Sequence, residues 1–218
     1  MKERIIPINP NQIDMAVIQL AADYIVKGEI VAFPTDTLYG IGCDPFNIKA
    51  IEKMFSLKSR SKQKPINLLI ESENQLHEIT EDLPTITQLL IEDFWPGALT
   101  LIFKKKKTIP SILTSNLPSI GIRMPNNPII LELIRKVKRP LAVTSANISG
   151  KPNTTNAKQV YENFRKEIPL ILDGGETSAG KESTIIDLTV DPPKILREGI
   201  LRLEEIRETL PYIEKISD

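Results

Sequence analysis

The chain has 218 residues, of which 41% are hydrophobic and 26% are charged, as is typical of a soluble globular protein. Lys and Arg together number 28, as do Asp and Glu, and this zero formal charge argues against a protein that binds nucleic acid over its whole surface. The single cysteine excludes an internal disulfide, and no stretch has the length of a signal peptide or membrane span, so we expect a cytoplasmic protein with no membrane contact.

Helical and extended segments alternate along the chain. Helical periodicity predicts helices at residues 11–27, 48–57, 83–95, 128–137, 156–166 and 203–210. Apolar runs predict strands at residues 30–33, 66–70, 98–103, 119–124, 141–144, 170–172, 183–188 and 194–196. This alternation favours an α/β fold with an open, twisted, mixed sheet and flanking helices, and the length suits one domain over residues 1–218.

The segment from Phe33 to Gly42 is the most informative part of the chain. An apolar run ends at Pro34 and is followed by two threonines, an aspartate, a tyrosine and two glycines. Such a sequence predicts either an ordinary turn after a strand or a wall against which a small polar ligand can lie. Later strands that end in similar polar residues favour the second interpretation.

A cationic loop follows the helix predicted at residues 48–57. Lys58 and Arg60 can simply complement the dipole at the end of that helix. Arg60 and Lys64 also suit a triphosphate, because arginine offers a planar fork of donors and lysine a mobile point charge. Both interpretations stay open on these residues alone.

Other strands also end in groups that suit anions. Arg123 ends an apolar strand, so its guanidinium needs either an internal acid or a substrate carboxylate as its partner. Ser145 and Asn147 follow the next strand and suit an anion-binding nest, although such clusters also form plain turns. Arg197 follows the last predicted strand. No nucleophile–base pair stands out, so the pattern favours chemistry by positioning and charge neutralisation, as in transfer at a nucleotide phosphate.

The segment from Gly175 to Lys181 has the spacing of a phosphate-binding P-loop. The next residue is Glu182 rather than the Ser or Thr that would hold magnesium. The residues after it are β-branched and predict a strand, whereas a P-loop must open into a helix. We therefore reject a P-loop here.

Seven short stretches, taken together and in this order, resemble the YrdC/TsaC family of threonylcarbamoyl-adenylate synthases. They are Pro34–Gly40, Lys58–Arg60, Arg123–Pro125, Thr144–Asn147, Asp173–Gly175, Ser183–Asp187 and Leu196–Gly199. The resemblance covers nearly the whole chain and implies an open α/β fold with a large, concave, basic face. Because the chain ends soon after the last stretch, we expect the additional C-terminal domain of longer relatives to be absent.

The resemblance also assigns roles to individual residues. Those expected to contact threonine are Thr37, Arg123, the backbone at Val143, and Ser183. Those expected to bind the nucleotide are Arg60, Lys64, Ser119, Ser145, Asn147, Asn153 and Arg197. Lys58 and Arg60 are expected to act in catalysis by neutralising charge on the leaving group. The chain departs from the family at Ser61, where proline is frequent, and at residues 64–67, where Lys-Pro-Ile-Asn replaces the common Asn-Pro-Leu-Ile.

The implied reaction joins L-threonine, bicarbonate or CO2, and ATP into threonylcarbamoyl-AMP and releases pyrophosphate. The product serves the N6-threonylcarbamoyl modification of adenosine 37 in tRNA, so the implied protein partners are the downstream tRNA threonylcarbamoyltransferase proteins, and weak RNA binding stays open. Mg2+ is expected to be held mainly by the ATP phosphates and water, so no residue is assigned as a metal ligand.

Two other functions fit parts of the sequence. A non-catalytic RNA-binding module would use the basic face, but it predicts aromatic residues among the cations, and aromatic content is only 5%. A carbamoyltransferase would use an already activated carbamoyl phosphate and would show no activity with ATP and bicarbonate.

Overall fold

The computed structural model describes residues 5–59, 61, 63–177 and 179–215. Its strands are β1 (Ile5–Pro7), β2 (Val31–Pro34), β3 (Tyr39–Cys43), β4 (Asn67–Leu69), β5 (Leu99–Lys104), β6 (Ser119–Arg123), β7 (Leu141–Ser145), β8 (Leu170–Asp173), β9 (Thr184–Asp187), β10 (Lys194–Arg197) and β11 (Glu214–Lys215). Its helices are α1 (Met15–Val26), α2 (Ile48–Leu57), α3 (Glu73–Ile79), α4 (Ile86–Phe94), α5 (Pro128–Val137), α6 (Ala157–Phe164), α7 (Leu203–Thr209) and a 3-10 turn, η1 (Arg165–Glu167).

The described strands form one mixed sheet in the order β1-β8-β2-β3-β7-β4-β6-β5-β9-β10-β11. β4 pairs with β6 in parallel and with β7 antiparallel, and β5 pairs with β9 in parallel. These crossovers make neighbours of strands that are far apart in the sequence. The mixed, open sheet with flanking helices agrees with the predicted α/β fold.

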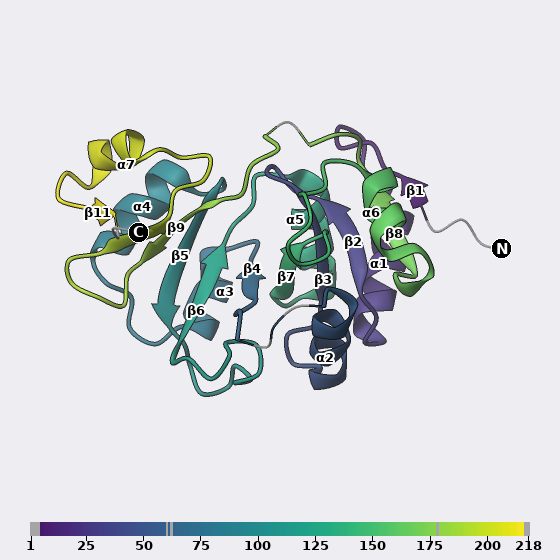
Figure 1. The fold of residues 1–218 in the computed structure, drawn as a ribbon, viewed down its shortest axis with the longest axis horizontal. Helices are drawn as coiled ribbons and strands as arrows, with labels where there is room; N and C mark the ends of the chain where they lie inside the picture. The colour runs from purple at the N-terminus through teal and green to yellow at the C-terminus, as the bar shows by residue number, and fades with distance from the viewer. Residues whose placement is uncertain (1–4, 60, 62, 178, 216–218) are drawn as a thin grey trace.

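Helices cover the two faces of the sheet unequally. Alternate residues of a strand point to opposite faces, and one face of β2, β7 and β8 packs against the apolar sides of α1 and α5. The other face packs against α2, α3, α4 and α6. In Figure 1, α1 and α5 lie beside β2 and β8, whereas α4 and α7 lie with β5 and β9 toward the opposite end. The two faces of the sheet therefore carry different sets of helices.

The sequence analysis did not predict strand β3 after Pro34. β2 and β3 form an antiparallel hairpin, so the segment that holds Gly40 and Gly42 is a strand. The two glycines look like turn residues, but here they make room for neighbouring side chains. A Cβ on Gly42 would lie 2.8 Å from the Phe33 ring, and one on Gly40 would lie 3.0 Å from Cγ1 of Val143.

Other elements differ from the prediction or confirm it. The sequence analysis missed β1, α3 and β11, which are short elements with too few apolar positions to show a period. The bounds predicted for α2 and α5 are confirmed, and the side chains of Asn47 and Asn127 cap their N-termini. β9 follows the glycine-containing loop, which confirms the strand predicted there. Within the described part of the chain, no helix is both long and apolar enough to cross a membrane.

Candidate active site

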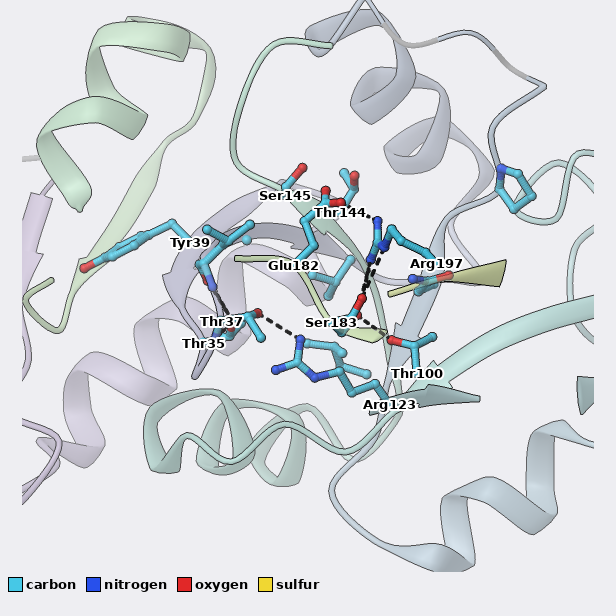
Figure 2. Close-up of a pocket in the computed structure, with 16 residues that line it drawn as sticks. Thr35, Thr37, Tyr39, Thr100, Arg123, Thr144, Ser145, Glu182, Ser183 and Arg197 are labelled. Atoms are coloured by element: carbon cyan, nitrogen blue, oxygen red, sulfur yellow. Dashed lines mark hydrogen bonds and ion pairs between the residues drawn. The ribbon is translucent and has the colours of Figure 1, made fainter. Parts of the chain in front are cut away.

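A pocket opens where loops from distant parts of the chain meet strands from the centre of the sheet (Figure 2). The residues that line it are Thr35, Thr37, Leu38, Tyr39, Gly40, Pro65, Asn67, Leu69, Thr100, Arg123, Val143, Thr144, Ser145, Glu182, Ser183 and Arg197. Six of them were predicted to contact substrates: Thr37, Arg123, Val143, Ser145, Ser183 and Arg197. The topology of the sheet therefore brings these six residues together around one cavity.

Arg123 is the buried cation of the pocket, with 6% of its surface exposed. Its Nε donates to the carbonyl of Gly97 at 2.8 Å, its Nη1 donates to Thr37 Oγ1 at 2.9 Å, and its Nη2 forms an ion pair with Asp36. Burial lowers the pKa of Arg123, and Asp36 opposes that effect. An arginine carries five N–H donors, so two remain for a bound anion after these three contacts with described residues. Both interpretations of Arg123 from the sequence therefore stay compatible with the structure, because an internal acid orients a guanidinium that still faces the pocket.

Ser183 and Arg197 form a second polar group beside Arg123. Ser183 Oγ and Thr100 Oγ1 lie 2.8 Å apart, and Arg197 Nη2 donates to the Ser183 carbonyl at 2.9 Å. Arg197 Nη1 also pairs with Glu182 at 2.5 Å. Burial lowers the pKa of Arg197, and Glu182 opposes the shift. Figure 2 shows these side chains and Arg123 converging on the same cavity.

The Ser145 end of the pocket is held from behind by Lys58. Ser145 Oγ donates to Asn147 Oδ1 at 2.6 Å, and Lys58 Nζ donates to the main-chain carbonyls of both Ser145 and Asn147. Lys58 is 1% exposed and does not line the pocket. Its catalytic role therefore stays a prediction, and in this structure its amine fixes the turn after β7.

The threonine-rich hairpin loop is tied together by its own hydroxyl groups. Thr35 Oγ1 lies 2.9 Å from Thr37 Oγ1 and donates to the Leu38 carbonyl at 2.7 Å. Tyr39 Oη donates to the Gly175 carbonyl at 2.7 Å, which links the hairpin to the loop before Ser183. Burial is the main cause that raises the pKa of Tyr39, so its hydroxyl keeps its proton at alkaline pH values at which an exposed tyrosine would ionise.

Four other predicted residues, Lys64, Ser119, Asn147 and Asn153, do not line the pocket. Arg60 lies outside the described residues, so its role stays a prediction. The sequence analysis assigned no role to several polar residues in or beside the pocket, among them Asp36, Asn67, Thr100 and Glu182. Asp36 could have been suspected because it stands beside Thr37. The other three carry no signal without the tertiary structure.

The donors of the pocket do not fit a metal ion held by the protein alone. Glu182 is the carboxylate among the described lining residues, and it already pairs with Arg197. Asp36, just behind the lining, is paired with Arg123. No group of three or more His, Cys, Asp or Glu residues suited to a metal was found within the described ranges. The residues present instead suit anionic and hydroxyl-bearing ligands.

The family model Sua5_yciO_yrdC, described as "Telomere recombination", matches residues 23–199. The chain belongs to this family. It is 44% identical over 196 residues to a threonylcarbamoyl-AMP synthase of Pyrococcus abyssi, and the matched region covers 90% of this chain and 58% of that protein. It is 39% identical over 191 residues to the Bacillus subtilis protein of the same name, and the matched region covers 87% of this chain and 55% of that protein.

A solved Sua5 structure is also similar throughout the chain. The structure of P. abyssi Sua5 complexed with L-threonine superposes with a TM-score of 0.95 at 42% identity, covering 97% of this chain and 62% of that one. The likeness confirms the Sua5/YrdC-type fold. This chain spans less than two thirds of the length of the Sua5 relatives described above.

Proposed function

We propose that the chain catalyses the formation of threonylcarbamoyl-AMP and pyrophosphate from L-threonine, bicarbonate or CO2, and ATP. The observation that carries the proposal is the buried guanidinium of Arg123, which faces the pocket between the hydroxyl groups of Thr37 and Ser183. A guanidinium with two N–H groups left over from its contacts with described residues suits the carboxylate of an amino acid. The relative crystallised with L-threonine supports this choice of amino acid.

The proposed reaction has two steps. The carboxylate of threonine binds Arg123, and its neutral amine attacks the carbon of CO2, forming an N–C bond and releasing a proton. An oxygen of the resulting carbamate then attacks the α-phosphorus of ATP, and the bond from that phosphorus to the β-phosphate oxygen breaks. Pyrophosphate leaves with the negative charge. Both steps depend mainly on holding the reactants in line and on balancing charge.

The chain supplies this positioning from two sides of the pocket. We assign the amino acid to Thr37, Arg123, Val143 and Ser183. We assign the nucleotide to Ser145 and Arg197, which line the pocket, together with Arg60, Lys64, Ser119, Asn147 and Asn153 from the sequence. Figure 2 shows Ser145 and Arg123 on opposite sides of the cavity, as binding of two ligands side by side would require. Mg2+ enters this scheme as part of the ATP complex, with its oxygen ligands from phosphate and water.

The product would be used by downstream tRNA threonylcarbamoyltransferase proteins to modify adenosine 37 of tRNA. We propose a cytoplasmic location, where ATP, threonine and tRNA are all available. These assignments rest on the family and not on a feature of the pocket.

Pyrophosphate release tests the proposal directly. The protein is incubated with ATP, magnesium, bicarbonate and each amino acid in turn, and the nucleotide product is identified by mass spectrometry. We expect release that requires bicarbonate and is fastest with L-threonine. Product formed from carbamoyl phosphate without ATP would instead support a carbamoyltransferase. If no product forms under either condition, both functions are rejected.

A further inference from the structure

Asn67 opens β4 and lines the floor of the pocket. β4 lies between β6 and β7 near the centre of the sheet, and asparagine is uncommon in such strands. Residues two apart share a face of a strand, so Asn67 lies on the same face as Leu69, whose partner on β6 is Arg123. The partner of Asn67 itself on β7 is Val143. Asn67 is therefore a diagonal neighbour of Arg123 on the adjacent strand, on the face of the sheet that lines the pocket.

Gly121 creates the space in which the Asn67 carboxamide lies. A Cβ on Gly121 would be 2.4 Å from Asn67 Oδ1 and 3.1 Å from its Cγ. Real Cβ atoms essentially never approach so closely, so with any other residue at position 121 the carboxamide would have to move from this position. The side chain is half-buried there and stays part of the pocket wall.

The hydroxyl groups around Arg123 are already engaged within the protein. Thr37 Oγ1 bonds to Thr35 and accepts from Arg123, and the hydroxyls of Thr100 and Ser183 bond to each other. In contrast, no hydrogen bond joins the Asn67 carboxamide to any of the residues that the structure describes. A carboxamide carries one acceptor oxygen and two N–H donors, and in Asn67 both kinds of group are available to a ligand.

We propose that Asn67 is a specificity-determining residue that binds the β-hydroxyl of the amino-acid substrate. The inference rests on the proposed function, because it takes Arg123 as the site of the substrate carboxylate. With the carboxylate held there, the polar groups left on threonine are its amine and its hydroxyl. A hydroxyl both donates and accepts, so it matches both halves of the carboxamide, whereas a carbamate only accepts. A site that hydrogen-bonds a substrate hydroxyl discriminates against an analogue that lacks it.

The test compares L-threonine with L-2-aminobutyrate, which has the same carbon skeleton without the hydroxyl. The proteins are the wild type, Asn67→Leu, Asn67→Thr and the control Asn74→Leu, which changes an exposed asparagine of α3 outside the pocket. For each protein, kcat/KM for pyrophosphate release and the binding affinity by calorimetry are measured with both amino acids. Thermal unfolding shows which variants keep the fold.

We expect Asn67→Leu to lower kcat/KM for threonine about tenfold, as for the loss of one hydrogen bond, and to change it less than about twofold for 2-aminobutyrate. Asn67→Thr restores part of the preference through its own hydroxyl, and Asn74→Leu behaves as wild type. An equal loss with both amino acids, or no loss with either, overturns the inference.

The calorimetry separates this inference from the proposed function. If wild type prefers threonine in binding and Asn67→Leu loses that preference while no pyrophosphate is released, the role of Asn67 stands and the reaction is wrong. If wild type binds neither amino acid, both proposals fall.

Discussion

Lys58 Nζ donates to the main-chain carbonyl of Asn147 at 2.6 Å, although the two residues are 89 positions apart in the sequence. The same amine also donates to the carbonyl of Ser145. The end of α2 is thereby joined to the turn after β7, and the side chain of Ser145 is presented to the pocket. Lys58, for which the sequence suggested a role at the helix dipole or in catalysis, supports the pocket wall from behind.

Replacement of Lys58 should destabilise the fold. Lys58→Met keeps the length of the side chain but leaves two carbonyl groups without their charged donor. We expect the free energy of unfolding to fall by about 2 kcal/mol, which urea denaturation measures. Pyrophosphate release should fall as well, since Ser145 loses its support. A variant as stable as wild type would show that the contacts with Ser145 and Asn147 contribute little.

If Arg123 binds the substrate carboxylate as proposed, Arg123→Ala abolishes pyrophosphate release with threonine, and it also leaves Asp36 unpaired. Removing one member of such a buried charged pair has a free-energy cost of about 2–5 kcal/mol, much of it from leaving the other charge unpaired. The control is Arg135→Ala, since Arg135 is an exposed arginine of α5 whose ion pairs with Glu71 and Glu132 lie outside the pocket. Turnover of Arg123→Ala at the wild-type rate would remove Arg123 from the site.

Arg60 carries a prediction that rests on the sequence alone. Arg60→Ala should abolish pyrophosphate release, because its guanidinium is expected to neutralise charge on the triphosphate. The affinity for ATP, measured in the absence of threonine, should fall as well. Unchanged ATP binding together with normal turnover would contradict the assignment.

Gly199 holds Glu182 and Ser183 in place by its lack of a side chain. A Cβ at this position would lie 2.2 Å from the carbonyl oxygen of Glu182 and 2.5 Å from the carbonyl carbon of Ser183. These are backbone atoms, so the clash cannot be relieved by a rotamer change. We expect Gly199→Ala to lower stability by about 1–3 kcal/mol and to raise KM for threonine. Wild-type values of both quantities would show that the backbone can yield.

The buried thiol of Cys43 should make the folded state less stable as the pH rises above 9. Burial raises the pKa of its thiol from 9.0 to about 12. Above pH 9 the unfolded chain loses this proton and the folded chain keeps it, so folding stability falls by about 1.4 kcal/mol per pH unit up to the folded pKa. Cys43→Ala should lack this decline.

Urea unfolding of wild type and Cys43→Ala at pH 8, 9 and 10 measures the effect as the difference in slope between the two proteins. The buried Tyr39, whose pKa is also raised, is present in both proteins and serves as a common background. Parallel slopes would mean that the thiol ionises as easily in the folded state as in the unfolded chain.

Several elements of the fold follow from the sequence alone. Residues 48–57 and 128–137 form helices with the predicted bounds, because a clear apolar period is preceded by an asparagine cap in each. β3 was missed because Gly40 and Gly42 are typical of turns, and their purpose becomes visible only when Phe33 and Val143 pack over them. Local signals predict local structure, but they do not show what lies across the sheet.

The candidate site divides in the same way. Arg123 and Arg197 could be chosen from the sequence as groups that suit an anionic ligand, because each stands at the end of a predicted strand, whereas Ser183 was assigned by the family resemblance. Which strands become neighbours depends on crossovers such as β5 to β9, and these are decided by packing of the whole sheet. Only the tertiary structure, therefore, pairs Arg123 with Asp36, turns Lys58 inward and lays Asn67 over Gly121, because each contact joins residues that the chain itself keeps apart.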